Sequence, residues 1–235
     1  MDQTLFSLAE GIRQCTACPL WKGRTIAVPG EGTITAKIMV IGEAPGTQED
    51  RLGLPFVGKS GKFLTTLFSE IGVDRSQLFI TSCVKCHPPE NRAPSSKELS
   101  TCKETWLLKQ IDILKPKLIV LVGGVALSTL LSQKQLNQKS RNLCPSWLEV
   151  NAAVDFATPD FRKPVSEERR KSPPFMVGDS CSSGFSLSKV HGKVIEHAAQ
   201  KYFITFHPSA ALRFPLLQVA IRADFQKLKK IIATL

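Results

Sequence analysis

Four short apolar runs rich in β-branched residues constrain the fold of this chain most. They cover residues 37–41, 78–81, 118–122 and 202–205, and each is four or five residues long. Nearly continuous hydrophobicity over such a length is typical of strands buried on both faces of a parallel sheet. Helical patterns lie between them at residues 59–71 and 96–114, the second after a serine cap, and apolar helical stripes lie near both chain ends. This alternation predicts an α/β fold, a three-layer α/β/α domain with a central four-stranded parallel sheet.

The stretch 133–188 does not follow this alternation. It contains five prolines, a serine-rich patch at residues 180–188 and nearly balanced charges. Such a composition favours loops over packed strands and helices. We therefore predict a single domain over residues 1–235 that carries a loop-rich insertion at 133–188.

Charge gives the first indication of a partner. The formal net charge is +11, while the apolar content of 43% and the charged content of 22% are ordinary for a globular protein. A basic protein attracts polyanions, because neutralised phosphates release their counterions. A merely solvated basic surface is the alternative. The chain has neither a signal-peptide pattern at its start nor an apolar run long enough to span a membrane, so we expect a soluble, cytoplasmic protein.

Chemically distinctive residues directly follow all four predicted strands. The strands run into Gly42-Glu43-Ala44-Pro45-Gly46, into Ser82-Cys-Val-Lys-Cys86, into Gly123-Gly124 and into Phe206-His207-Pro208-Ser209. The carboxyl ends of parallel strands meet at one edge of a sheet, where ligands bind in open α/β folds. The sequence therefore predicts a single site that all four segments build together.

The seven cysteines of the chain form a second pattern. Cys15 and Cys18 are three residues apart after the first helical segment, and Cys86 and Cys102 lie further along the chain. Four thiolates suit either zinc or an iron–sulfur cluster, and the spacing does not choose between the two. Buried free thiols are the alternative, and we assign Cys83, Cys144 and Cys181 to that class.

Three blocks of this sequence together resemble family 4 uracil-DNA glycosylases. They are Gly42-Glu-Ala-Pro-Gly-Thr-Gln-Glu-Asp50 with Gly53-Leu-Pro-Phe-Val-Gly58, then Val84-Lys-Cys-His-Pro-Pro-Glu-Asn-Arg92, then His207-Pro-Ser-Ala-Ala-Leu-Arg213. The resemblance covers residues 10–130 and 189–213 and leaves the insertion outside. It implies a DNA-repair hydrolase that cleaves the N-glycosidic bond of uracil in DNA and leaves an abasic site. It also implies a structural [4Fe-4S] cluster bound by Cys15, Cys18, Cys86 and Cys102, in a prokaryotic protein.

The resemblance assigns roles to the loops at the predicted edge of the sheet. Phe56 would stack on the flipped base, and backbone N–H groups at Gly42, Glu43 and Ala44 would bind its acceptors. Gly46 leaves room beside uracil C5, and Asn91 joins the substrate-binding set. His207 would stabilise negative charge at uracil O2 while the sugar becomes oxocarbenium-like. Glu43 and Glu49 are candidates for loop structure, for positioning the sugar or for handling water, or are caps of a helix N-terminus.

One position differs from other uracil glycosylases, and a second departs from the pattern of the family itself. Ala44 stands where better-known uracil glycosylases carry an aspartate base. Ser82 stands where the family usually has an asparagine, whose amide pairs with uracil O4 and N3–H. A hydroxyl cannot make the same bidentate contact, which predicts either weakened discrimination between uracil and cytosine or help from a neighbouring group.

Phosphate contacts complete the predicted interface with DNA. We assign them to Lys59, Ser60, Lys85, Ser209 and Arg213. The expected partner is uracil-containing DNA, single- or double-stranded, bound by a monomer without any membrane association. Two alternatives stay open: a DNA-binding relative that lacks turnover or acts on another deaminated base, and a zinc-bound nucleic-acid module without an active site.

Overall fold

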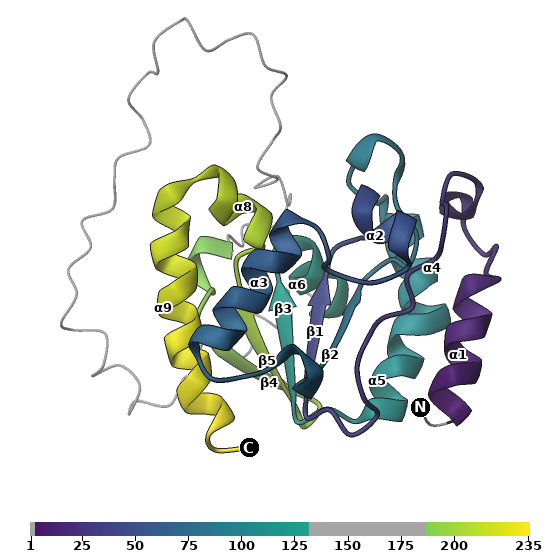
Figure 1. Ribbon diagram of the computed structural model, residues 1–235. Coiled ribbons are helices and arrows are strands. Elements are labelled where there is room, and N and C mark those ends of the chain that lie inside the picture. The colour runs from purple at the N-terminus through teal and green to yellow at the C-terminus, as the bar shows by residue number, and fades with distance from the viewer. Residues whose placement is uncertain (1–2, 132–186) are drawn as a thin grey trace, which may run out of the picture.

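A five-stranded sheet forms the centre of the molecule. The computed structural model describes residues 3–131 and 187–235, and within them the strand order is β2-β1-β3-β5-β4 (Figure 1). The strands are β1 (Ile38–Gly42), β2 (Leu78–Ser82), β3 (Leu118–Val122), β4 (Val194–His197) and β5 (Gln200–Thr205). The first three and β5 run parallel, as predicted, and β4 pairs antiparallel with β5. The α/β class and the four parallel strands are thus confirmed, and the sheet has one strand more than the four predicted.

The fifth strand was missed because its sequence carries no continuous apolar run. β4 is four residues long, half-exposed, and lies at the edge of the sheet. Ala198 and Ala199 connect it to β5, and both have positive φ, at 48° and 62°. Two-residue turns with positive φ usually contain asparagine and glycine, so the two alanines do not indicate a turn in the sequence.

Helices cover both faces of the sheet. Figure 1 shows α3, α8 and α9 on one side, and α1 and α5 on the other. The longer helical elements are α1 (Gln3–Arg13), α2 (Thr47–Leu52), α3 (Lys59–Glu70), α4 (Ser96–Cys102), α5 (Leu108–Leu114), α6 (Gly124–Leu130), α8 (Pro208–Arg213) and α9 (Pro215–Ile232). Short helical turns occur at Pro19–Lys22 (η1), Arg75–Gln77 (η2), Pro89–Asn91 (η3) and Leu187–Lys189 (η8).

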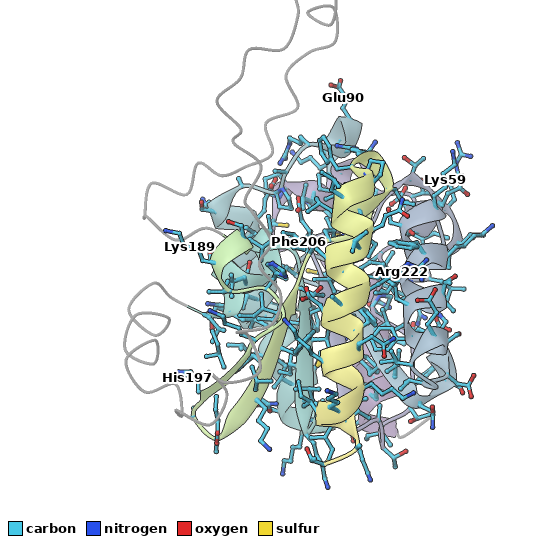
Figure 2. All side chains as sticks on the ribbon, turned by 90° about the vertical axis from the view of Figure 1, so that its left-hand side faces the viewer. Lys59, Glu90, Lys189, His197, Phe206 and Arg222 are labelled. Atoms are coloured by element: carbon cyan, nitrogen blue, oxygen red, sulfur yellow. The ribbon has the colours of Figure 1, made fainter. Side chains whose placement is uncertain are left out.

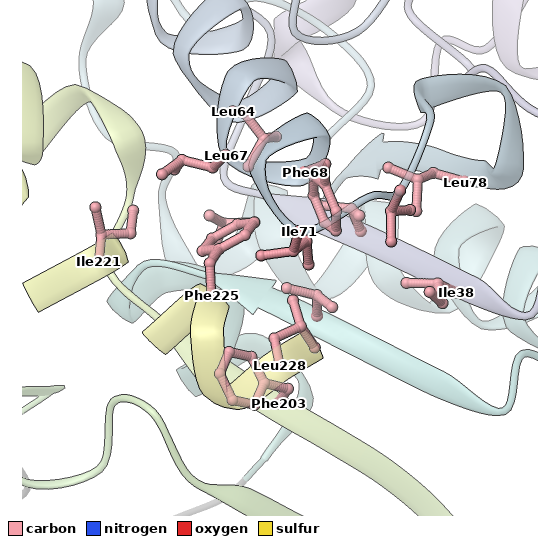
Figure 3. Close-up of a cluster of buried hydrophobic side chains, with 14 of the residues drawn as sticks. Ile38, Leu64, Leu67, Phe68, Ile71, Leu78, Phe203, Ile221, Phe225 and Leu228 are labelled. Carbon is pink, nitrogen blue, oxygen red and sulfur yellow. The ribbon is translucent and has the colours of Figure 1, made fainter. Parts of the chain in front are cut away.

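Each face of the sheet has its own apolar core. On one face, Phe68 of α3 meets Phe225 of α9 edge to face at 5.0 Å, above Phe203 of β5 (Figure 3). On the opposite face, Met39 and Ile119 pack with side chains from α5 and α6. Because alternate residues of each central strand enter opposite cores, every residue of β1, β2 and β3 is buried.

The predicted helix 96–114 is one continuous helical rod with a π-helical turn inside it, at Lys103–Leu107 (η4). It starts from Ser95, whose hydroxyl accepts from the Glu98 N–H while the Glu98 carboxylate accepts from the Ser95 N–H. Arg92 donates to both oxygens of that carboxylate, and the pKa of Glu98 falls to about 2 as a result. The π turn begins directly after Cys102, and such turns occur frequently at functional sites.

The carboxyl end of β5 is held from the side of α9. Asp224 is 1% exposed, and it accepts hydrogen bonds from the Thr205 hydroxyl at 2.9 Å and pairs with His191 Nδ1 at 3.0 Å. The His191 ring lies 4.3 Å from the ring of Phe206, the residue that follows Thr205. This network fixes the position from which the chain turns into the His207 loop.

The predicted insertion 133–188 lies almost entirely outside the described residues. Within the described residues, no helix combines the length and the apolar character needed to cross a membrane.

Candidate active site

The four strand ends meet at one edge of the sheet, as predicted. Gly42 pairs with Ser82 at the ends of β1 and β2, and Val122 pairs with Thr205 at the ends of β3 and β5. The ladder continues past the strands, because the Cys83 N–H donates to the Gly42 carbonyl at 2.9 Å. Ser82 is 4% exposed and therefore lies at the base of this edge rather than on its rim.

An aromatic ring stands over the end of β1. A Cβ built on Gly42 would lie 2.4 Å from Phe56 Cζ, so only a glycine lets the ring approach the strand this closely. The Phe56 ring centroid lies 5.9 Å from that of His207, with the rings tilted by 33°. The Phe56 side chain and the His207 loop thus face one another across the strand ends, as their predicted joint role requires.

The backbone at Phe56 is unusual and well supported. Its φ is +50°, a left-handed conformation that aromatic residues seldom adopt. The Arg75 guanidinium donates to the Phe56 carbonyl at 3.2 Å, and Gly61 gives that carbonyl room, since a Cβ there would lie 1.9 Å from its oxygen. A strained residue held by several neighbours is typical of a ligand-binding position.

Glu49 organises the loops around this ring. Its carboxylate accepts N–H bonds from Gly46 at 3.1 Å, from Val57 at 2.9 Å and from Gly58 at 2.8 Å. These three bonds join the start of α2 to the segment that carries Phe56. Of the roles we considered for Glu49, loop structure matches its contacts, because both carboxylate oxygens are already engaged by backbone donors.

Glu43 differs from Glu49 in its surroundings. It is half-buried, and burial raises the pKa of its carboxyl above the ordinary value. Among the described residues, no hydrogen bond to its carboxylate is found. Glu43 is therefore the carboxylate of this loop that remains available to a water molecule or a sugar.

His207 caps the short helix α8 with its own imidazole. The Ser209 N–H donates to Nδ1 at 3.2 Å, and the Ser209 hydroxyl lies 2.7 Å from the same nitrogen. Nδ1 is thus an acceptor, and the proton of the neutral ring resides on Nε2. Burial, with the positive charge of Arg213, lowers the pKa of His207 to about 4. Gly123, at φ +97°, permits this placement, since a Cβ there would lie 3.1 Å from His207 Cβ.

The remaining predicted residues occupy different surroundings. Lys59 is exposed at the start of α3 and Arg213 is exposed on α8, and these two helices pack together. Asn91 is exposed in η3 with a φ of +55°, and the adjacent Glu90 projects at the end of the molecule that also carries Lys59 (Figure 2).

The expectation that Lys85 contacts a phosphate is wrong for this conformation. The side chain is 1% exposed, and its ammonium donates to Thr81 Oγ1 at 2.6 Å and to the Ser82 carbonyl at 2.8 Å. Burial lowers its pKa to about 8. The surrounding motif suggested a basic surface, but its position three residues past Ser82 turns the side chain back under the end of β2.

The four cysteines of the predicted metal site line one small cavity. Cys15 and Cys18 follow α1, Cys86 follows β2 and Cys102 ends α4. Trp106 Nε1 donates to Cys15 Sγ at 3.1 Å, and Arg24 Nη1 donates to Cys86 Sγ at 3.1 Å. In the described part of the chain, no three His, Cys, Asp or Glu side chains are close enough to bind a single metal ion.

Three side chains of the site are not among the residues predicted from the sequence. Arg24 and Trp106 donate to the cysteine sulfurs, and His87 Nδ1 contacts the Pro45 carbonyl at 2.9 Å. The position of Trp106 could have been predicted, since it lies four residues after Cys102 on a predicted helix and therefore shares a helix face with Cys102. The position of Arg24 could not, because its approach to Cys86 depends on the path of the loop after η1.

Comparisons with known proteins agree with this geometry. The family model of the Uracil DNA glycosylase superfamily matches residues 29–235. A type-4 uracil-DNA glycosylase of Thermotoga maritima is 39% identical over 172 residues, which are 72% of this chain and 89% of the relative. The type-4 enzyme of Pyrobaculum aerophilum is 37% identical, over 95% of this chain and 90% of the relative. The type-4 enzyme of Sulfurisphaera tokodaii is 35% identical, over 98% of this chain and 86% of the relative. The chain belongs to the uracil-DNA glycosylase superfamily and, within it, to the type-4 uracil-DNA glycosylases.

Proposed function

We propose that this chain hydrolyses the N-glycosidic bond of uracil in DNA at the strand-end site, with Phe56 stacked on the flipped base and His207 at the edge of that base. The observation that carries the proposal is the pairing of an aromatic ring with a histidine in a defined tautomer, across the ends of parallel strands. A flipped base needs a flat apolar surface and positioned polar groups, and this edge of the sheet offers both. The product is an abasic site for base excision repair.

His207 acts as a neutral hydrogen-bond donor in this proposal. Because Nδ1 accepts from Ser209, Nε2–H is free to donate to uracil O2 as negative charge develops on the departing base. A neutral donor suffices, since uracil leaves as an anion that needs stabilisation rather than full protonation. The low pKa of His207 keeps the ring in this form at neutral pH.

Glu43 is our candidate for positioning the water nucleophile. It has the raised pKa and the unengaged carboxylate that such a role needs, whereas Glu49 holds the loop. The backbone N–H groups of Gly42, Glu43 and Ala44 bind the acceptors of the base in this proposal, while the carbonyls of Gly42 and Glu43 accept from the N–H groups of Cys83 and Val84. Ser82 supports the floor of the site beside Gly42.

The cysteine site fits a [4Fe-4S] cluster better than a single metal ion. Four sulfurs from three separate segments surround one cavity, yet no trio is close enough to bind one ion. N–H donors already point at two of the sulfurs, as is common around iron–sulfur clusters. When bound, the cluster would supply structural cross-linking of α1, η1 and α4, and the hydrolysis itself is redox-neutral.

DNA binds over the same edge of the sheet. Lys59 and Ser60 at the start of α3, and Ser209 and Arg213 on the adjacent α8, supply the phosphate contacts. Lys85 does not belong to this set. The protein acts as a monomer on single- or double-stranded uracil-containing DNA.

The decisive experiment is abasic-site formation on uracil-containing oligonucleotides of both kinds. We expect cleavage by the wild type and at least a 100-fold loss in His207→Ala, typical of a removed oxyanion donor. His197→Ala is the matched control, because His197 pairs with Gln200 at the opposite end of β5. Bound uracil-DNA without product, from protein with its metal site loaded, would instead favour a relative without turnover.

A further inference from the structure

Lys85 is a buried cation that lacks an anionic partner within the described residues. Both acceptors of its ammonium, Thr81 Oγ1 and the Ser82 carbonyl, are neutral. None of the ion pairs found in residues 3–131 and 187–235 includes it. A buried charge is strongly destabilising unless it is paired, so this lysine calls for a nearby anion.

The cavity of the four cysteines adjoins the same side chain. Lys85 lines this cavity together with Cys15, Cys18, Cys86 and Cys102. Arg24 brings a second positive charge to its rim, where the guanidinium also donates to the Cys15 carbonyl at 2.8 Å. Two cations around four thiols match a group that is anionic when bound, and four thiolates holding iron and sulfide form such a group.

The contacts of Lys85 also lead to the base pocket. Ser82, whose carbonyl accepts from the ammonium, pairs with Gly42 under the Phe56 ring. Thr81, the other acceptor, donates to the Pro29 carbonyl at 3.0 Å, beside Gln110 of α5. Ala44 of the pocket loop packs against the apolar residues around Cys86 and Cys102.

We propose that Lys85 is the internal counter-cation of the cysteine-bound iron–sulfur cluster, and that its hydrogen bonds to Thr81 and Ser82 make the shape of the base pocket depend on the cluster. This rests on the cluster assignment made above. Lys85 is a positioning residue in this proposal, since it touches neither the base nor the reacting bond. The cluster then stabilises the pocket through charge as well as through its bonds to three segments of the chain.

The test compares Lys85→Met with the wild type, each with the cluster bound and after its removal by a chelator and oxidant. Methionine keeps the length and apolar stem of lysine but removes the charge. With the cluster bound, we expect Lys85→Met to melt roughly 5–10 °C below the wild type. After removal the order should reverse, because the wild type then retains an unpaired buried cation and the variant does not.

Two controls separate charge from packing. Lys97→Met removes an exposed cation from α4, the helix that ends at Cys102, and should leave both melting temperatures nearly unchanged. Lys85→Arg keeps the charge and should retain more cluster than Lys85→Met, measured as iron and sulfide per protein. The reduction potential of the cluster should fall in Lys85→Met and hold in Lys97→Met, because lost positive charge disfavours the reduced state.

The outcomes are distinct. If Lys85→Met melts below the wild type in both states by the same amount, its role is packing and the proposal is overturned. If the wild type, reconstituted with iron and sulfide, holds no cluster, the cofactor assignment fails and this inference fails with it. If Lys85→Met does not fold, hydrogen exchange of the wild type decides: loss of protection at amides 82–85 on cluster removal supports the proposal, and unchanged protection overturns it.

Discussion

His207 should work as a neutral ring, and acidification tests this directly. Burial and Arg213 hold its pKa at about 4, against an ordinary value of 6.5. At pH 5 a histidine with a pKa of 4 is about 90% neutral, whereas one with a pKa of 6.5 is only about 3% neutral. Protonation would place a hydrogen on Nδ1, directly against the Ser209 N–H, and would displace the ring.

The expected result follows from these fractions. Between pH 7 and pH 5, single-turnover excision of uracil should fall by only about 10% if neutral His207 is the active form with a pKa near 4. An ordinary imidazole would lose about 25-fold over the same interval. The assay is abasic-site formation on a single-stranded oligonucleotide, with enzyme in excess, so that product release does not contribute.

Stability provides an independent measurement of the same pKa. The native state binds this proton only near pH 4, while the unfolded chain binds it below pH 6.5. Stability from this group is therefore present above pH 6.5 and is lost as the pH falls towards 4, by about 2 kcal/mol at pH 5. His207→Asn keeps a helix cap and cannot titrate, so the wild type should lose about 2 kcal/mol more than this variant between pH 7 and pH 5.

An acid limb of the excision rate with an apparent pKa near 6.5 would refute the neutral-ring role of His207, and so would equal pH dependence of stability in the wild type and His207→Asn. Either result would mean that Nδ1 is solvated and that the contact with Ser209 does not set the tautomer. If the residual activity of His207→Asn falls with acid in the same way as the wild-type activity, another group titrates, and Glu43 is the first candidate.

Three further substitutions test the architecture of the pocket. Glu49→Gln should destabilise the fold by about 2–4 kcal/mol in urea titrations and raise KM, because a neutral amide accepts the three N–H bonds more weakly. An unchanged KM would show that Glu49 does not organise the loops of the pocket. Gly42→Ala should displace the Phe56 ring from the end of β1 and reduce the rate of excision at least 10-fold, while the melting temperature changes little. Full activity of this variant would show that the ring does not stack on the base. Ser82→Asn should sharpen discrimination between uracil and other deaminated bases or cytosine, measured as ratios of excision rates, and identical profiles would contradict our reading of Ser82.

Local sequence patterns determined most of the fold and part of the site. Buried parallel strands must be continuously apolar, so their four segments were visible in the sequence, and their shared direction brought Gly42, Ser82, Gly123 and His207 to one edge. The edge strand β4 was invisible, because a short half-exposed strand with an alanine turn leaves no periodic signal. Motif resemblance identified the pocket loops, though not which carboxylate would be free.

Tertiary structure alone decided the environment of each group, because burial and hydrogen-bond partners come from segments distant along the chain. The tautomer of His207 depends on the Ser209 N–H and its low pKa on surrounding burial, and Glu49 and Glu43 differ through contacts made across the loop. Lys85 is the clearest case. Its motif indicates a basic surface, but the path of the chain after β2 buries the Lys85 ammonium beside the cavity of the four cysteines. The environment that the fold gives this charge, and not the local sequence, therefore determines its role.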